Sequence, residues 1–111
     1  MKLPGAERAV IDSRKLRDYV LSRTHPVGRY KAAFFASLGF TVDNWQGLEA
    51  ALRKAAAEGD AELYESTPYG EKYRLRSILQ GPIGAPAEIV SVWIVRHGDD
   101  RPHLVTVMPG R

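Results

Sequence analysis

The sequence predicts an α+β fold in which helices come first and an antiparallel β-meander follows. Apolar residues recur at helical spacing through residues 12–58. From Asp60 onward they alternate or run continuously between turns rich in Gly and Pro. Helices that precede the strands, rather than alternating with them, are typical of α+β domains. We therefore expect three N-terminal helices packed on one face of a C-terminal antiparallel β-meander of three to four strands.

Length and composition limit the class of protein. A chain of 111 residues has the size of one domain, residues 1–111. It has no cysteine, which excludes a disulfide framework and a thiolate zinc site. Residues 1–5 lack the apolar core of a signal peptide, and no apolar run approaches the roughly 20 residues that span a bilayer. We expect a cytoplasmic protein without membrane contact.

The first helix is expected from Asp12 or Ser13, which would cap it, to about Leu21. Its buried stripe consists of Leu16, Tyr19 and Val20. The second helix is expected over residues 28–38, after the helix-breaking Pro26. Its buried face would consist of Tyr30, Phe34 and Leu38. The third is expected over residues 44–58, where Asp43 and Gln46 have the spacing of a capping box.

Four strands are expected in the remainder of the chain. They span residues 61–65, 71–80, 86–96 and 103–108. If Gly81 to Gly84 forms a four-residue hairpin loop, Lys72 lies opposite Trp93. A last turn over residues 97–102 then places Trp93 opposite Thr106. A one-residue shift of this pairing would exchange the two faces of a strand.

This register assigns each strand residue to one face of the sheet. The core face would carry Tyr73, Leu75, Leu79, Val90, Val92, Ile94, Val105 and Val107. The outer face would carry Lys72, Arg74, Arg76, Ser91, Trp93, Val95, Leu104, Thr106 and Met108. Cations that bind phosphates beside an aromatic ring that stacks on bases are typical of an RNA-binding surface. Two alternatives are an ordinary solvated face and an apolar surface for a protein partner or a homodimer.

A cationic stretch lies at the start of the second helix. Residues 1–40 carry eight Lys and Arg against three Asp and Glu, which predicts a positive pole. His25, Arg29 and Lys31 surround a helix N-terminus, which attracts anions. Ribonuclease chemistry without a metal needs a base, an acid and cations for the phosphorane, and His25 is suited to proton transfer. The alternative for His25 is a histidine that caps backbone N–H groups.

Other chemistries find little support. His97 and His103 flank the last turn, but only Asp99 and Asp100 could add a carboxylate, so we expect no metal site. The sequence contains no phosphate-binding loop, dinucleotide fingerprint or nucleophile elbow, and we expect no cofactor.

Several motifs resemble a family. They are Leu3-Pro4, Ala6-Glu7-Arg8-Ala9, His25-Pro26-x-Gly28-x-x-Lys31-Ala32, Leu38-Gly39-Phe40, Tyr69-Gly70-x-x-Tyr73, Gly81-Pro82-x-Gly84, Trp93-Ile94-Val95 and Pro102-x-Leu104-Val105-Thr106. Together they resemble a group of small uncharacterised bacterial proteins, whose members also occur as C-terminal modules of phage or secreted-toxin chains. Their order of helices and strands is similar to that of the barnase, EndoU, colicin and RelE superfamily of ribonuclease toxins. This resemblance marks His25, Lys31, Tyr69, Trp93 and Thr106; relatives often carry tyrosine where this chain has Met108.

Our leading hypothesis is a metal-independent endoribonuclease toxin of a toxin–antitoxin or related system, which acts on RNA and is restrained by a small antitoxin-like protein. The candidate catalytic residues are His25, Lys31 and Thr106, and the candidate substrate-binding residues are Arg29, Tyr69, Lys72, Arg74, Arg76 and Trp93. The alternative is a non-catalytic module, such as an antitoxin, immunity or scaffold protein, that forms a dimer or hetero-complex through the outer sheet face. A third hypothesis is nucleic-acid binding without cleavage.

Overall fold

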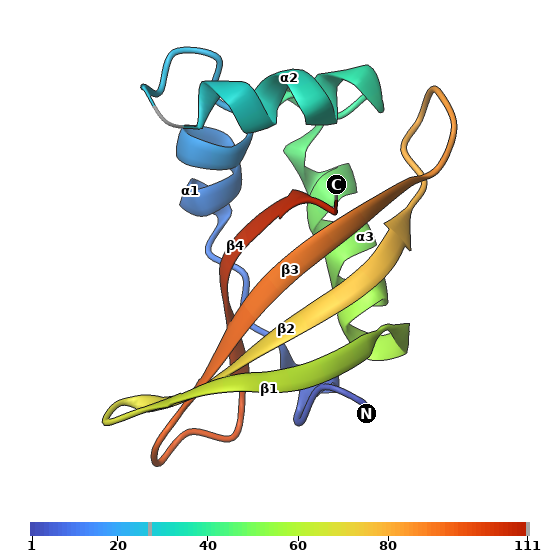
Figure 1. Ribbon diagram of the computed structural model, residues 1–111. Helices are drawn as coiled ribbons and strands as arrows, with labels where there is room; N and C mark the ends of the chain where they lie inside the picture. Colours follow the sequence, from blue (N-terminus) through green and yellow to red (C-terminus); the bar gives the residue numbers. More distant parts are fainter. Residues whose placement is uncertain (27, 111) are drawn as a thin grey trace.

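The computed structural model describes residues 1–26 and 28–110 and confirms the α+β fold (Figure 1). The helical elements are η1 (Ala6–Arg8), α1 (Ser13–Lys15), the π-helical turn η2 (Leu16–Val20) that continues it, α2 (Arg29–Ser37), η3 (Val42–Asn44) and α3 (Trp45–Glu58). The strands are β1 (Asp60–Thr67), β2 (Gly70–Leu79), β3 (Ala87–Arg96) and β4 (Pro102–Pro109). They form one antiparallel sheet in the order β1-β2-β3-β4.

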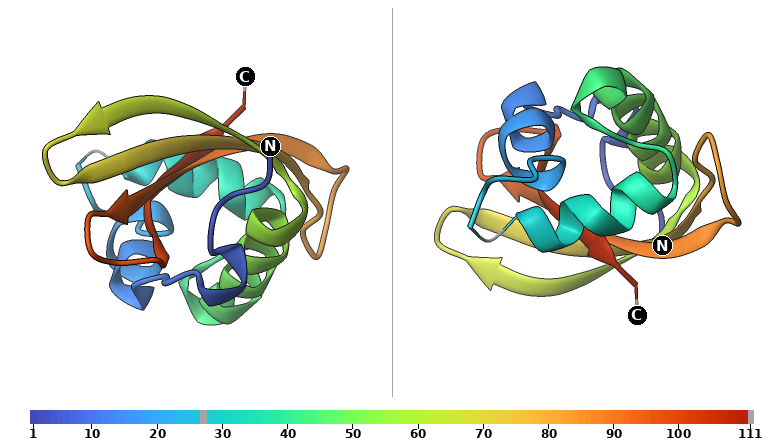
Figure 2. Two further views of the ribbon diagram at one scale, coloured as in Figure 1. Left: turned by 90° about the horizontal axis from the view of Figure 1, so that it is seen from below. Right: turned by 90° about the horizontal axis from the view of Figure 1, so that it is seen from above.

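The helices cover one face of the strongly curled sheet (Figure 2). α3 packs against β2, and α2 packs against η2 and β4. The N-terminal segment, residues 3–11, threads between α3 and the sheet edge. There Val10 forms a parallel bridge to His103, and the Arg53 guanidinium of α3 donates to the Ala9 carbonyl. No helix of residues 1–26 and 28–110 lies on the outer face of the sheet.

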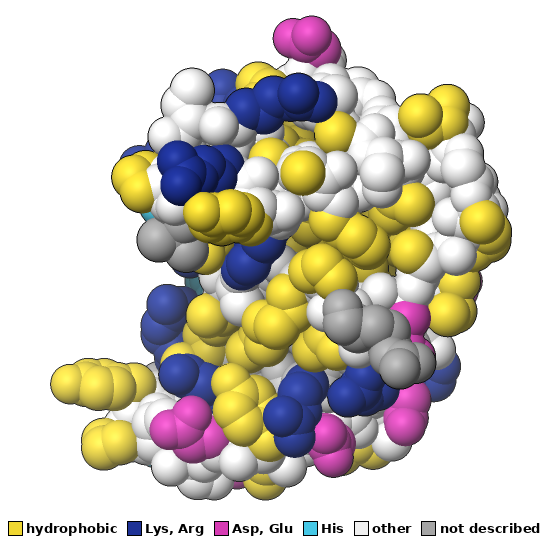
Figure 3. Space-filling view, turned by 45° about the horizontal axis from the view of Figure 1, so that its top comes forward, with side chains coloured by type: hydrophobic (Ala, Val, Ile, Leu, Met, Phe, Trp, Pro, Cys, Tyr) yellow, Lys and Arg dark blue, Asp and Glu magenta, His cyan; other side chains and the backbone are white. Residues whose placement is uncertain are grey.

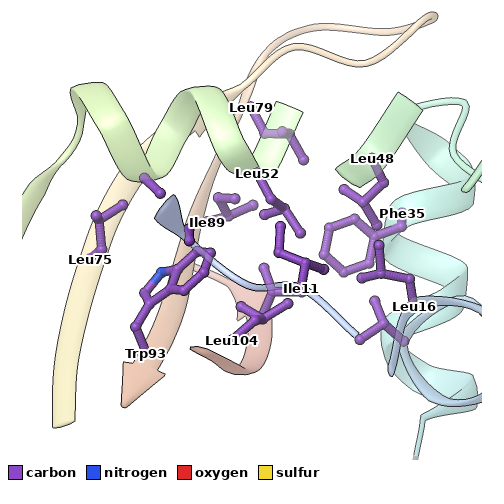
Figure 4. Close-up of a cluster of buried hydrophobic side chains, with 14 of the residues drawn as sticks. Ile11, Leu16, Phe35, Leu48, Leu52, Leu75, Leu79, Ile89, Trp93 and Leu104 are labelled. Carbon is purple, nitrogen blue, oxygen red and sulfur yellow. The ribbon is translucent and has the colours of Figure 1, made fainter. Parts of the chain in front are cut away.

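An apolar cluster joins the sheet to all three helices (Figure 4). Trp93, Leu75 and Ile89 line the sheet side, and Phe35, Leu48 and Leu52 line the helical side. Trp93 is fully buried, and its indole N–H donates to the Ser91 hydroxyl at 2.9 Å. A buried indole is stable only when its N–H finds an acceptor, and Ser91 supplies one.

Two predicted details of the helices were wrong. Ala32 and Phe35 are buried in α2, and Leu38 at its C-cap is buried as predicted, with Phe34 partly buried; the Tyr30 side chain, however, is 70% exposed. The helix is thus rotated so that Lys31 points toward β4. The capping box joins Thr41 and Asn44 rather than Asp43 and Gln46, because the chain makes the 3-10 turn η3 before α3 begins.

The predicted β2–β3 register was wrong by one residue. Lys72 lies opposite Ile94, and Tyr73 lies opposite Trp93. The lysine and two arginines of β2 point outward as expected, but the faces of β3 are exchanged. Ile89, Ser91 and Trp93 face the core. Val90, Val92 and Ile94 lie on the other face, outside the main core cluster, although Val90 and Val92 are themselves buried.

The cause is the hairpin loop, which spans residues 80–86 instead of 81–84. The loop leaves the sheet to pack on the end of α2, where the Ile83 N–H donates to the Leu38 carbonyl at 3.1 Å. Gly81 allows this contact, since a Cβ there would lie 2.0 Å from the same carbonyl oxygen. This tertiary contact sets the loop length and therefore the register.

A β-bulge divides β4 into two parts. Thr106 lies opposite Val92 and Leu104 lies opposite Trp93, so Val105 is the extra residue. Thr106 therefore faces outward, as predicted, while Leu104 is buried in the core, against prediction. Val105 was expected in the core, but it is only partly buried and lines two surface pockets.

Candidate functional site

Two candidate catalytic residues from opposite ends of the chain meet beside β4. The Lys31 ammonium group of α2 donates to the Thr106 hydroxyl oxygen at 2.8 Å. Thr106 accepts this bond, so its own O–H proton can be donated to a ligand. Lys31 forms no ion pair with a carboxylate in the part of the chain that the structure describes. A cation and a hydroxyl are thus presented together at the surface.

Tyr19 connects this pair to His25. The Lys31 nitrogen lies 4.9 Å from the centre of the Tyr19 ring, a cation–π distance. The His25 ring contacts the same tyrosine edge-on, with ring centres 4.8 Å apart. We refer to Tyr19, His25, Lys31 and Thr106 as the Lys31 cluster. Three of its members were predicted as catalytic candidates.

Local sequence positions the helical members of the Lys31 cluster. The His25 Nδ1 atom accepts the Gly28 N–H at 3.0 Å, so His25 stabilises the turn that leads into α2. Gly28 lies so close to η2 that a Cβ would be 2.0 Å from the Tyr19 carbonyl oxygen. The Pro-x-Gly part of the motif therefore brings the start of α2 against Tyr19. The Gly28 contact is the kind expected under the alternative for His25, a histidine that caps backbone N–H groups.

A cationic hollow lies beside the Lys31 cluster and is lined by two of its members, Tyr19 and Thr106. One pocket of about 280 Å³ is lined by Lys15, Tyr19, Val105 and Thr106. A second pocket of about 350 Å³ shares Lys15 and Val105 with it and adds Lys72, Arg96 and His103. In Figure 3, Lys and Arg side chains lie on both sides of the hollow between the helices and the sheet at the left of the view. Such a surface concentrates positive potential and attracts anions.

His103 is held by the last turn rather than by His97. Its Nε2 atom lies 3.0 Å from the Asp99 carboxylate, which also accepts the Arg101 N–H at 2.9 Å. The Arg101 backbone N–H, the His103 ring and the Arg101 guanidinium hold the pKa of Asp99 well below its usual range. Within residues 1–26 and 28–110, no three His, Asp or Glu side chains are arranged to hold a metal ion.

Other predicted site residues lie outside the Lys31 cluster. Trp93 cannot stack on a base, because it is fully buried; its assignment to the outer face was wrong. The Arg29 guanidinium lies over the neighbouring Tyr30 ring and donates to its hydroxyl at 3.0 Å. Tyr69 is 77% exposed in the β1–β2 turn, directly before β2 begins.

The basic residues of β2 are paired with carboxylates. Arg74 contacts Glu62 at 3.0 Å and Arg76 contacts Glu88 at 3.4 Å, while Lys72 lies 3.7 Å from Glu65. These ion pairs reduce the positive potential of the outer face. Without Trp93, the expected platform of cations and an aromatic ring is not present on this face, although Lys72 also lines the second pocket.

The sequence analysis missed Tyr19 and Lys15 as site residues. Tyr19 has the spacing of a core position beside Leu16 and Val20, but it is only partly buried. Lys15 belonged to a helix face expected to be solvated. The available signal was an aromatic residue at the edge of an apolar stripe, next to a cation. Ordinary helix packing produces the same pattern, so it does not by itself indicate a site.

The structure is that of a small α+β protein, and its two pockets together form a cationic groove between the helices and β4. The chain belongs to the family described as Domain of unknown function (DUF6883), whose model matches residues 2–111. This agrees with the resemblance to a family without an established activity. No curated protein matches the chain.

A solved structure has the same fold. It is a chain of a contact-dependent growth inhibition toxin–immunity protein complex from Klebsiella pneumoniae 342. The match has a TM-score of 0.72 and 19% sequence identity, and it covers 96% of this chain and 97% of that chain. The likeness extends over both chains but, at this identity, concerns the fold alone. None of the helices among the described residues is long and apolar enough to cross a membrane.

Proposed function

We propose that this protein is a metal-independent endoribonuclease toxin of a conflict system and that it cleaves RNA at the Lys31 cluster. The observation that carries this proposal is the 2.8 Å contact between the Lys31 ammonium group and the Thr106 hydroxyl, beside Tyr19 and His25. The cationic hollow gives a polyanion access to this point. The fold shared with a chain from a growth inhibition toxin–immunity complex supports the biological setting.

The reaction is an internal transesterification. The 2′-oxygen of the ribose attacks phosphorus and the bond to the 5′-oxygen breaks, which gives a 2′,3′-cyclic phosphate and a 5′-hydroxyl end. The 2′-hydroxyl proton is lost to solvent, and a proton is delivered to the departing 5′-oxygen. No electrons are exchanged. The catalyst has to stabilise the negative charge of the phosphorane and supply the second proton.

Lys31 and Thr106 are suited to the first task. The ammonium charge and the Thr106 O–H would both be directed at non-bridging phosphate oxygens, as a preorganised pair. His25 is assigned to the second task. Because its Nδ1 accepts the Gly28 N–H, the neutral ring carries its proton on Nε2. Donation of a proton to the 5′-oxygen requires the doubly protonated ring and therefore release of the Gly28 contact.

The test is RNA cleavage in EDTA, with analysis of the product ends. We expect cyclic phosphate ends, a loss of about 10²-fold or more for Thr106→Val and Lys31→Met, and about 10²–10⁴-fold for His25→Asn. Asparagine keeps an acceptor for the Gly28 N–H but cannot transfer a proton. Lys54→Met on α3 removes a lysine outside the groove and should keep full activity. Intact RNA at high protein concentration would contradict the proposal.

A second candidate function is the non-catalytic protein-binding module. It is favoured by the uncovered outer sheet face, where Ile78 is 66% exposed and the cations are already paired. This candidate predicts a stable dimer or complex in light scattering, which Ile78→Asp breaks and His25→Asn leaves intact.

A further inference from the structure

We propose that the pocket formed by Lys15, Lys72, Arg96 and His103 holds a second phosphate of the strand whose reacting phosphate lies at the Lys31 cluster. This inference rests on the proposed function for the identity of the ligand, a single-stranded nucleic acid. We call this pocket the flanking subsite. It has a volume of about 350 Å³ and joins the pocket at Thr106 through Lys15 and Val105.

The position of the flanking subsite suits a continuous strand. It follows β4 away from Thr106, with His103 on the same strand and Lys72 and Arg96 on β2 and β3. Lys15 lies on the helical side of both pockets and would contact the backbone between the two phosphates. A strand bound at Lys31 and extended along β4 therefore enters the flanking subsite.

The charges of the flanking subsite favour an anion. Lys15 and Arg96 form no ion pair among the described residues, and the Lys72–Glu65 distance is a long 3.7 Å. The one carboxylate in the lining, Asp12, has both oxygens on the Arg14 side chain, at 3.1 and 2.8 Å. Asp12 is thus paired with a residue outside the pocket. Of the three Lys and Arg side chains in the lining, Lys15 and Arg96 have no carboxylate partner among the described residues, and Lys72 has Glu65.

The lining also selects a phosphate over a base. Its apolar members are aliphatic: Val10, Ile94, Leu104 and Val105. Bases of single strands are bound chiefly by stacking on aromatic rings, and this lining contains no Phe, Tyr or Trp. His103 offers an imidazole whose orientation is fixed by the Asp99 contact at 3.0 Å. We therefore expect charge recognition without sequence preference here.

The experiment measures binding of uncleavable 2′-O-methyl RNA to the full chain as a function of salt. Each phosphate contact on a single strand adds about 0.7 to the slope of log affinity against log salt. For a hexanucleotide, loss of the one phosphate contact at the flanking subsite in Lys72→Gln/Arg96→Gln should reduce this slope by about 0.7, and for a dinucleotide, with its single phosphate, by nothing. Lys2→Gln/Lys54→Gln removes the same charge near the end of α3 and should leave both slopes unchanged.

The outcomes separate this inference from the proposed function. Cleavage by the native protein with an unchanged slope in Lys72→Gln/Arg96→Gln overturns the flanking subsite alone. A reduced slope without any cleavage overturns the ribonuclease and supports the subsite. An equal reduction of the slope in the control variant overturns the subsite, as does the absence of RNA binding by the native protein. The subsite is also overturned if Lys72→Gln/Arg96→Gln weakens binding of an acidic protein partner and leaves RNA binding unchanged. Should the double variant unfold, Arg96→Gln alone should still reduce the slope, by at most about 0.7.

Discussion

At the scale of single residues, the Lys31 cluster depends on one close backbone approach. Gly28 lets the start of α2 lie against the carbonyl of Tyr19, and Tyr19 in turn contacts both His25 and Lys31. The sequence motif with His25, Gly28 and Lys31 suggested an anion site formed by the helix N-terminus itself. In the structure, Gly28 of this motif instead sets the distance between η2 and α2. Lys31 of α2 then reaches β4, where it donates to the Thr106 hydroxyl.

Gly28→Ala should therefore damage the site and the fold together. The new Cβ would lie 2.0 Å from the Tyr19 carbonyl oxygen, so α2 and η2 must separate. We expect a loss of about 1–3 kcal/mol in urea unfolding, as for other overpacked positions, and a larger relative loss of cleavage than of stability. Ala33→Gly, at an exposed position of α2, is the control and should cost about 1 kcal/mol without moving the start of the helix. An unchanged Gly28→Ala variant would show that this contact is not tight in solution.

At the scale of elements, the helices could be predicted more fully than the strand pairing. Gly and Pro mark helix ends locally, and Leu16 and Val20 of the first predicted helix are buried as expected. The faces of β3 depend instead on the length of the loop before it. That length is set by contacts of Ile83 and Gly81 with Leu38, which local sequence does not reveal.

The placement of β3 has a consequence for Ser91. Its hydroxyl accepts the Trp93 N–H inside the core, so Ser91→Ala leaves a buried donor unpaired. We expect a loss of about 1–3 kcal/mol in the free energy of unfolding, measured by urea denaturation. Ser77→Ala is the matched control on the same face of the sheet, because the Ser77 hydroxyl oxygen is buried without a hydrogen-bond partner among the described residues. That variant should be neutral or more stable, and equal losses in both would contradict the assignment of Trp93 to the core.

At the scale of the whole molecule, the N-terminal segment holds the two layers together. Leu3, Ala9 and Ile11 are buried in the same cluster as Trp93 and Phe35, and the backbone of Val10 bonds to Pro102 and Leu104 of β4. The same segment leads into α1 and supplies Val10 and Asp12 to the flanking subsite. The sequence does not predict these contacts, because an irregular segment has no periodicity to indicate its partners.

Ile11→Ala should consequently destabilise the entire fold. Ile11 is 7% exposed between the sheet and the helices, and truncation of such a side chain costs about 2–5 kcal/mol. Urea denaturation followed by both tryptophan fluorescence and circular dichroism should show one transition at a lower midpoint. Val42→Ala, at a position that is 43% exposed, should change stability by less than about 0.5 kcal/mol. Separate transitions for the two signals would show that the layers unfold independently.

The extra residue in β4 shifts the alternation of side chains between the two faces of this strand. On one side of Val105, Leu104 packs under Trp93; on the other, Thr106 faces Lys31, although a regular strand would put both on the same surface. Both halves of β4 contribute to the core, through Leu104 and Val107, while Thr106 is turned toward Lys31. Without the extra residue, Leu104 and Thr106 would face the same side, and one of their two contacts would be lost. The bulge therefore lets neighbouring residues of one strand serve both the core and the surface beside Lys31.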